Sequence, residues 1–304
     1  MKENNVLQRR RTKSPASLFF YEYIQEVYEM KRSTLKVLVC AVIVVMMIVG
    51  TVACSSSGKS SEKAVPSEAA GKEEDSFKGS LKGKTLSIGT DVSFVPFEFP
   101  DENDVYVGFD MDLIAAISDY LGFEYKMEPM DFTAMLMSVQ TSKIDVGIAG
   151  ITMTDEREKV MDFSDPYYDA GIQILVREDS EITSFSELSD KTLAIKEGTA
   201  SLTFCEEHYP EAKIVTFTTI DEAYLEVSRG AADACVFDAP NMLYYVSQNP
   251  DCGCKVVGEL EDACQYGILF PADSELKKYF DAALAELRAD GTYDRIYDTW
   301  FGSN

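Results

Sequence analysis

The 304-residue chain is poor in the residues that bind metals and polyanions. It has one histidine, His208, and 28 Lys and Arg against 52 Asp and Glu, a net charge of −24. This excess of acid argues against nucleic acid and anionic lipid as partners of the folded part. The Cys-Gly-Cys segment at 252–254 is too short for zinc spacings and is far from His208 in sequence. The sequence therefore predicts no metal site, and it gives no sign of a cofactor.

A long apolar run is also missing. The apolar stretch at residues 37–49 follows a basic cluster of Lys31, Arg32 and Lys36, and Ala53-Cys54 comes shortly after it. A run of this length is too short for a comfortable membrane span and is typical of an export signal. Residues 30–53 resemble a bacterial lipoprotein signal peptide, in which Cys54 is lipidated and becomes the new N-terminus. An uncleaved N-terminal anchor is the alternative.

Two further segments surround this signal. Residues 1–29 are unlike the start of a signal peptide, and Met30 directly precedes the basic cluster. We therefore expect translation to begin at Met30 and residues 1–29 to be a mis-annotated extension. Residues 54–80 are polar and contain Gly and Pro, which predicts a lipidated cysteine followed by a flexible tether. The expected location is the extracytoplasmic face of the cell membrane, held there by the lipid.

Outside the signal, an odd number of cysteines remains. They are Cys205, Cys235, Cys252, Cys254 and Cys264. An odd number in an exported domain cannot all pair internally. The sequence leaves open a disulfide from Cys252 or Cys254 to Cys264, as well as buried or unpaired thiols.

The folded region contains a weak internal repeat. "GKTLSIGTDVSF" at 83–94 is echoed by "DKTLAIKEGTAS" at 190–201, and "FTAMLMSVQTSKIDVGIAG" at 132–150 by "DEAYLEVSRGAADACVFDA" at 221–239. Each copy of the second pair predicts an amphipathic helix, a polar turn and a strand that opens with an aspartate. Strands that alternate with helices favour parallel α/β sheets, and two copies favour two lobes.

Other helices are expected at 111–121, 201–209 and 274–301, with a break at Gly291 in the last. Ligands of open α/β sheets bind beyond the carboxyl ends of the strands. The segments in those places are "TDVSFVPFEF", "AGITMTDER", "KEGTAS" and "FDAP".

Arg157 is a cation where a helix is expected to begin. Thr154 is a suitable N-cap for a helix over "TMTDEREKVM", and the positive end of a helix dipole disfavours an arginine in the first turn. This position therefore points to a bound anion. A surface ion pair with Glu158 or Asp162 is the alternative.

Eight motifs between residues 81 and 304 occur in a recognisable order. They are "GTDVSFVPFEF", "VGFDMDLIAAI", "PMDFTAML", "AGITMTDEREKVMDFSDPYY", "KEGTAS", "FDAPNMLYYV", "QYGILFP" and "GTYDRIYDTWFG". Together they resemble the family 3 extracytoplasmic solute-binding proteins of amino-acid ABC transporters, most closely the glutamine-binding branch. The resemblance implies two Rossmann-like α/β lobes in a periplasmic-binding-protein-like fold of type II. The lobes would be 81–167 plus 268–304, and 172–264, joined by hinge strands near "YYDAG" and "CQYGI".

The resemblance also implies how the backbone of an amino acid is held. Arg157 would grip the α-carboxylate, Thr152 would add its hydroxyl or amide, and Gly150 would let the ligand approach the chain. A guanidinium can bond a carboxylate in bidentate fashion, and amides at a helix start near Ala200 would add donors. Asp238 would take the α-ammonium on the far lobe. Its alternative role is the N-cap of the helix that follows.

Side-chain selectivity, on the same resemblance, would rest on three aromatic and two charged residues. Phe94 and Phe132 would sandwich the aliphatic stem of the ligand, with Phe237 nearby, although each ring could simply be core. Asp91 would accept from the amide of a glutamine side chain and Lys196 would donate to its carbonyl. Asp91 and Lys196 could instead pair with each other.

These features predict a substrate-binding lipoprotein that captures a polar amino acid, most specifically glutamine, and delivers it to the permease subunits of an ABC transporter. The expected protein is a monomer and not an enzyme. Two alternatives remain from other classes. One is a ligand-sensing module of a signalling system. The other is a dehydratase on the same fold, for which Glu98 and Glu197 are the candidate acids and bases.

Overall fold

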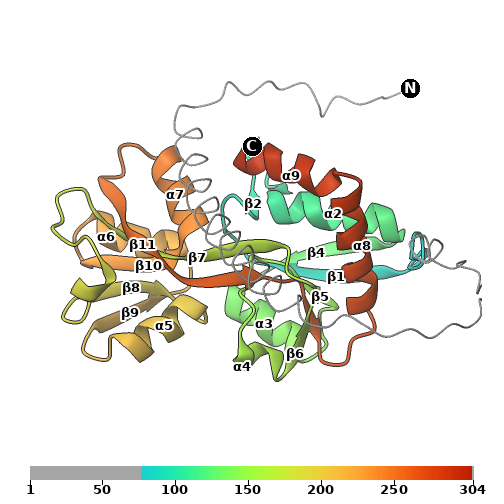
Figure 1. The fold of residues 1–304 in the computed structure, drawn as a ribbon, viewed down its shortest axis with the longest axis horizontal. Helices are drawn as coiled ribbons and strands as arrows, with labels where there is room; N and C mark the ends of the chain where they lie inside the picture. The colour runs from blue at the N-terminus through green and yellow to red at the C-terminus, as the bar shows by residue number, and fades with distance from the viewer. Residues whose placement is uncertain (1–76, 303–304) are drawn as a thin grey trace, which may run out of the picture. The chain divides into compact units, whose positions relative to one another are not determined.

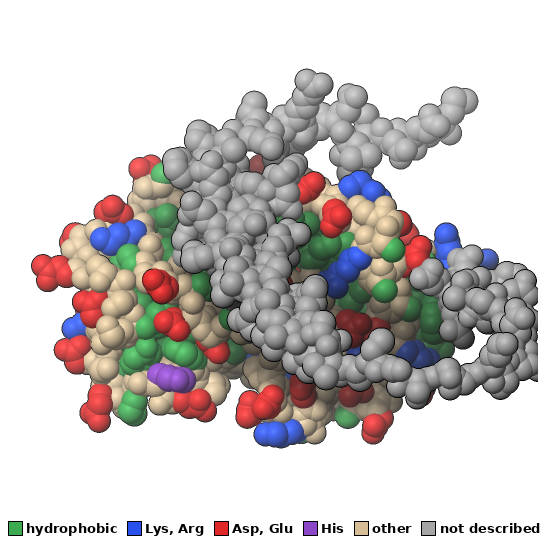
Figure 2. Space-filling view, viewed as in Figure 1, with side chains coloured by type: hydrophobic (Ala, Val, Ile, Leu, Met, Phe, Trp, Pro, Cys, Tyr) green, Lys and Arg blue, Asp and Glu red, His purple; other side chains and the backbone are tan. Residues whose placement is uncertain are grey.

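The computed structural model describes residues 77–302 and consists of two five-stranded sheets with helices packed on them (Figure 1). The predicted extension, signal peptide, lipidated Cys54 and most of the tether lie outside these residues. None of the helices between residues 77 and 302 is both long enough and apolar enough to cross a membrane. On the face seen in Figure 2, acidic side chains are spread widely rather than gathered in one patch, which indicates a general surface charge.

The first sheet is built around the parallel strands that the first half of the repeat predicts. Its order is β4 (Glu124–Pro129), β1 (Thr85–Thr90), β5 (Val146–Gly147), β12 (Leu269–Pro271) and β6 (Met161–Phe163). β1 is parallel to β4 and β5, whereas β12 returns antiparallel between β5 and β6. Figure 1 shows α2, α8 and α9 on one face and α3 on the other; these are α2 (Phe109–Leu121), α8 (Lys277–Ala289), α9 (Thr292–Phe301) and α3 (Phe132–Gln140).

The second sheet repeats this plan. Its order is β11 (Cys254–Tyr266), β7 (Tyr168–Arg177), β10 (Ala234–Asp238), β8 (Thr192–Lys196) and β9 (Lys213–Phe217). β8 is parallel to β9 and β10, and β7 runs antiparallel to β10 and β11. Its helices are α5 (Ala200–His208), α6 (Ile220–Ser228) and α7 (Ala239–Gln248). The short elements are β2 (Phe99–Pro100), β3 (Tyr106–Val107), α4 (Asp155–Glu158) and η1 (Phe185–Glu187).

The aspartates directly before the repeated strands β5 and β10 make equivalent hydrogen bonds in the two sheets. Asp145 Oδ2 accepts from the backbone N–H of Ser87 at 2.8 Å, and Asp233 Oδ2 accepts from that of Thr192 at 2.7 Å. Each carboxylate therefore ties the start of its own strand to the neighbouring parallel strand, β1 or β8. The repeat in the sequence is thus a repeat of this strand-pairing device.

Two strands connect the lobes. β7 and β11 pair along much of their length, and beyond them Tyr167 N–H donates to the Tyr266 carbonyl at 2.9 Å. Ser164 N–H donates to the Ile268 carbonyl at 2.8 Å, where the paired chains enter the first sheet. The predicted α/β fold of two lobes with a two-strand connection is confirmed. We keep 81–167 plus 268–304, and 172–264, as the proposed limits of the lobes.

One expected helix is much shorter than its pattern suggests. The Thr154 hydroxyl accepts from the N–H of Arg157 at 3.3 Å, as predicted, but α4 ends at Glu158. The chain then enters β6, because Met161 and Phe163 are buried in the core and their strand pairs with β12. This pairing partner lies a hundred residues away in sequence, and it overrides the local helical pattern. The C-terminal helix does break at Gly291, whose φ of +74° is left-handed.

Candidate functional site

A cleft between the lobes collects every ligand-binding residue that the sequence predicts. It encloses about 310 Å³ of empty space, including the open mouth, and both sheets contribute to its wall. The nine predicted residues all line it: Asp91, Phe94, Phe132, Gly150, Thr152, Arg157, Lys196, Ala200 and Asp238. Most of them follow the carboxyl end of a strand, which is where open α/β sheets bind ligands.

Arg157 lines the cleft and is held by carbonyl groups. Its Nη1 donates to the Thr152 carbonyl at 2.7 Å, and its Nη2 donates to the Gly198 carbonyl, on the other lobe, at 3.0 Å. Among residues 77–302 its guanidinium forms no ion pair, so the expected alternative with Glu158 or Asp162 is not observed. Burial lowers the arginine pKa to about 10, which leaves it cationic at neutral pH. The cleft thus holds a positive charge that lacks a carboxylate partner.

Asp238 supplies a carboxylate on the opposite lobe. It ends β10 and directly precedes α7, but its side chain does not cap that helix. Instead, its Oδ1 accepts from the Tyr266 hydroxyl at 2.7 Å, on the connecting strand β11. Burial raises the pKa of Asp238 to about 6, against the lowering effects of Tyr266, Lys196 and Arg157. Asp238 thus occupies the N-cap position of α7, as the alternative predicted, but its side chain makes no capping hydrogen bond.

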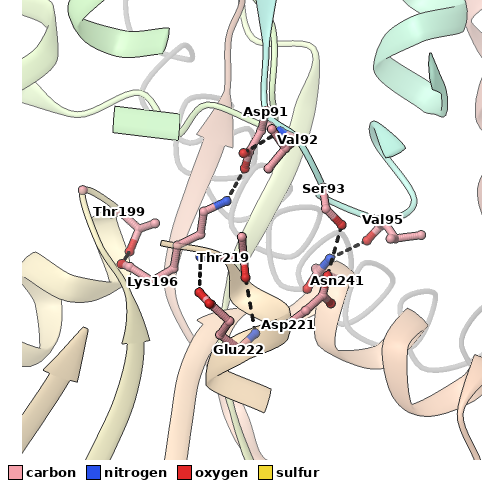
Figure 3. A network of polar contacts seen from close by, with 12 residues as sticks. Asp91, Val92, Ser93, Val95, Lys196, Thr199, Thr219, Asp221, Glu222 and Asn241 are labelled. Carbon is pink, nitrogen blue, oxygen red and sulfur yellow. Dashed lines mark hydrogen bonds and ion pairs between the residues drawn. The ribbon is translucent and has the colours of Figure 1, made fainter. Parts of the chain in front are cut away.

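Asp91 and Lys196 pair with each other across the cleft (Figure 3). Asp91 follows β1 in the first lobe, Lys196 ends β8 in the second, and each side chain is only 2% exposed. Asp91 Oδ1 also accepts from the Val92 N–H at 2.7 Å. Burial raises the Asp91 pKa, and the charge of Lys196 opposes that rise. The pairing left open by the sequence is thus present in this closed arrangement.

Aromatic rings form the remaining wall. The Phe132 ring centroid lies 5.4 Å from the Arg157 guanidinium carbon and 5.5 Å from the Lys196 ammonium, so it contacts both cations. Phe94 meets Phe237 edge to face at 5.7 Å. Gly150, with φ of +52°, lies beneath Phe94, where a Cβ would come within 2.2 Å of the ring. These rings are buried, yet they face the cleft rather than only the core.

Further contacts close the lobes outside the cleft (Figure 3). Asn241 Nδ2 donates to the Val95 carbonyl at 2.6 Å, and the Tyr224 hydroxyl donates to Asn241 Oδ1 at 2.6 Å. Ser93 Oγ donates to Asp221 Oδ2 at 3.3 Å. These residues do not line the cleft. They join the segment after β1 to helices of the second lobe.

Three further residues line the cleft, Ala149, Thr199 and Phe237, and of these the sequence predicts only Phe237, as an aromatic residue beside the ligand. Phe237 and the helix start around Thr199 have recognisable signals in the sequence, an aromatic residue beside Asp238 and a Gly-Thr turn. Ala149 has none, because a small apolar residue at a strand end is indistinguishable from core.

The cysteines lie on α5, β10 and β11 and in the turn before β11. All five between residues 77 and 302 are free thiols, and no cluster of three or more His, Cys, Asp or Glu side chains in that range could hold a metal. β11 carries Cys254 at one end and Cys264 near the other. Their pairing partners on β7, Arg177 and Ala170, are seven residues apart, so the two Cα atoms are separated by roughly 24 Å, far beyond the reach of a disulfide. The disulfide to Cys264 left open by the sequence is therefore excluded by the strand.

Comparison with known proteins identifies the family. The model of the bacterial extracellular solute-binding proteins, family 3, matches residues 86–303. The chain belongs to this family. Its predicted type II fold is confirmed by a solved ancestral arginine-binding protein, which is 42% identical with a TM-score of 0.69 and covers 72% of this chain and 98% of that one. A solved ancestral arginine-binding protein bound to glutamine is also 42% identical, with a TM-score of 0.69, and covers 72% of this chain and 98% of that one.

Two family members from Bacillus subtilis (strain 168) are similar in sequence. The arginine-binding extracellular protein ArtP is 31% identical over 227 residues, 73% of this chain and 89% of ArtP. The ABC transporter glutamine-binding protein GlnH is 31% identical over 275 residues, 87% of this chain and 97% of GlnH. The family is thus established for this solute-binding protein, and its named members differ in the amino acid they bind.

Proposed function

We propose that this protein is the substrate-binding lipoprotein of an ABC transporter and that it captures a polar amino acid, glutamine in preference to others. The observation that carries the proposal is the convergence of the predicted ligand-binding residues in one cleft between two lobes. The names of the relatives support it, since they are binding proteins for amino acids and GlnH is named for glutamine and an ABC transporter.

The two ends of an amino acid match the two isolated charges of the cleft. The Arg157 guanidinium would bind the α-carboxylate, aided by Thr152 and by amides at the start of α5. Asp238 would bind the α-ammonium from the other lobe. A ligand that contacts both residues bridges the lobes, so its binding free energy favours the closed form.

Charge balance favours a neutral side chain. The charged residues that line the cleft are two cations and two anions: Arg157, Lys196, Asp91 and Asp238. A zwitterion with a neutral side chain keeps these charges balanced, whereas arginine would add an unmatched cation and glutamate an unmatched anion. The amide of glutamine would donate to Asp91 and accept from Lys196, so each member of the ion pair would gain a hydrogen bond.

The transport cycle follows from the two lobes. Closure around the amino acid excludes water, which strengthens each polar contact. The closed monomer would then dock on the permease subunits in the membrane, with lipidated Cys54 and the tether keeping it nearby. The dehydratase alternative finds no support in the cleft, because neither Glu98 nor Glu197 lines it.

Calorimetric titration of ligand-free protein against the twenty amino acids and cystine tests the proposal. We expect glutamine to bind most tightly. If arginine binds most tightly, the charge-balance argument for the side chain is wrong, while the amino-acid role stands. If no amino acid binds, the transport role is wrong. An Arg157→Ala variant is the matched control, because a ligand that binds in this cleft must bind the variant more weakly than it binds wild type.

A further inference from the structure

Two carboxyl groups are completely buried behind the wall of the cleft. Glu98 and Asp110 are both 0% exposed, and neither lines the cleft. Asp110 lies in the first turn of α2, and Glu98 lies just before β2. An ionised carboxylate in such a place is costly unless hydrogen bonds or a cation compensate it.

One oxygen of Asp110 holds the cleft wall in place. Asp110 Oδ2 accepts from the Gly150 N–H at 2.9 Å and from the Tyr167 hydroxyl at 2.9 Å. The Tyr167 oxygen is also 3.2 Å from the Gly150 nitrogen, so the three groups form a closed triangle. Gly150 itself lines the cleft in a left-handed conformation, against the Phe94 ring. The direction of the Gly150 peptide is thus set from behind by Asp110.

The remaining three oxygens of the two carboxyl groups lack a hydrogen-bond donor among the described residues. Within residues 77–302, Asp110 Oδ1 and both Glu98 carboxyl oxygens are buried without any N–H or O–H group that donates to them. The two carboxyl groups are, however, within hydrogen-bonding reach of each other. Ionised carboxylates only accept hydrogen bonds, so two of them in contact would repel each other. One proton between them turns the contact into an O–H···O⁻ hydrogen bond.

We propose that Glu98 and Asp110 share a single proton, and that this acid pair is the positioning element that fixes the Gly150 peptide in the wall of the cleft. Glu98 provides the O–H and Asp110 the carboxylate, which then accepts three hydrogen bonds, from Glu98, Tyr167 and Gly150. The proposal concerns the folded protein itself. Only its binding test rests on the proposed function.

The groups around the pair favour this state. Asp91, Lys196, Tyr106 and Tyr167 are its charged or titratable neighbours. The one cation among them, Lys196, is already paired with Asp91. Burial, followed by the charges of Asp110 and Asp91, raises the pKa of Glu98 well above its usual value. Burial also raises the pKa of Asp110, to about 7. One proton therefore stays on the pair at neutral pH.

The pH dependence of unfolding tests the shared proton without any ligand. Above about pH 4.5 the unfolded chain releases a proton that the folded pair keeps, so this contribution to stability is complete below that pH and declines as pH rises. We expect the unfolding constant from urea titrations of wild type to rise up to about tenfold per pH unit relative to Glu98→Gln, between about pH 5 and pH 8. Asp110→Asn should behave like Glu98→Gln, since either amide replaces the shared proton by a permanent N–H. Identical slopes for wild type and both variants would overturn the proposal.

Binding tests the positioning role. Glu98→Gln keeps a donor to Asp110, whereas Glu98→Leu of similar volume leaves Asp110 without one. We expect glutamine affinity at pH 7 to stay within about threefold of wild type in Glu98→Gln and to fall at least tenfold in Glu98→Leu. Equal losses in both variants would contradict the role of the donor. If wild type binds no amino acid, the proposed function fails, and the pH slopes alone decide on the acid pair. If Glu98→Leu does not fold, the pH slopes of wild type, Glu98→Gln and Asp110→Asn again decide on the acid pair.

Discussion

Asp91 and Lys196 form a buried ion pair that joins the two lobes across the cleft. Asp91 follows β1 and Lys196 ends β8, and these strands are the first elements of the two sequence repeats. Each repeat therefore supplies one half of the pair, from the carboxyl end of its first strand. Because the pair spans the lobes, it can form only when they are closed, and in the proposed binding mode the ligand's side chain would share these two groups.

The Lys196→Met variant tests how the pair sets ligand choice. Removing the cation leaves Asp91 buried without a partner, which typically costs roughly 3–5 kcal/mol in such pairs. We expect glutamine affinity to fall at least tenfold, and arginine to gain relative to glutamine because its guanidinium can pair with Asp91. Calorimetry with both amino acids measures the ranking. The double variant Asp91→Asn, Lys196→Met should lose this gain, and an unchanged ranking in the single variant would exclude Lys196 from the selectivity site.

The Arg157→Ala variant tests the carboxylate clamp. Arg157 is proposed to bind a group that all amino acids share, so we expect every ligand to lose roughly 2–5 kcal/mol of binding free energy. Arg157→Lys, which keeps the charge but not the planar fork, should give an intermediate loss. Titration of the two best ligands measures both effects. A change below twofold for the best ligand would show that the clamp is elsewhere.

The raised pKa of Asp238 leads us to expect weaker amino-acid binding in acid. An ammonium pairs only with the ionised carboxylate, and the pKa of Asp238 is raised to about 6 by burial. Ligand affinity should therefore be constant above this pH and fall by up to tenfold per pH unit below it. The effect on folding has the opposite sign, because a carboxyl with a raised folded pKa loses stability as pH rises. Calorimetry between pH 4.5 and 8 checks this, and Asp238→Asn should bind weakly with a flatter profile. An equally steep profile in that variant would assign the titration to another group.

The sequence predicts the membership of the cleft well, for a geometric reason. Parallel strands place their carboxyl ends along one edge, so Asp91, Lys196 and Asp238 come together once the strands are recognised. Arg157 is recognisable as a cation at a helix start. These inferences need only local patterns and the family motifs, and the structure adds how each charge is held.

What the sequence could not predict depends on contacts between distant residues. Nothing near Asp238 indicates that its oxygen is held by Tyr266 rather than by its own helix. Nothing near Thr154 indicates that β12 stops the helix after one turn. Glu98 and Asp110 are residue types that usually lie on the surface, and only the packed fold shows that they are buried against each other. In each case a long-range partner decides the outcome.

The Asn241→Ala variant tests closure apart from ligand contact. Asn241 is buried in α7, is oriented by the Tyr224 hydroxyl, and donates to the Val95 carbonyl on the other lobe. Its hydrogen bond exists only in the closed form, so losing it should weaken every ligand by the same factor. A net hydrogen bond of about 0.5–1.5 kcal/mol predicts a loss of roughly twofold to tenfold. Calorimetry with glutamine and the next-best ligand should show this loss with the ranking unchanged. Tyr224→Phe, which keeps Asn241 but frees its side chain, should give a smaller loss of the same kind. A changed ranking would instead place Asn241 among the residues that select the ligand.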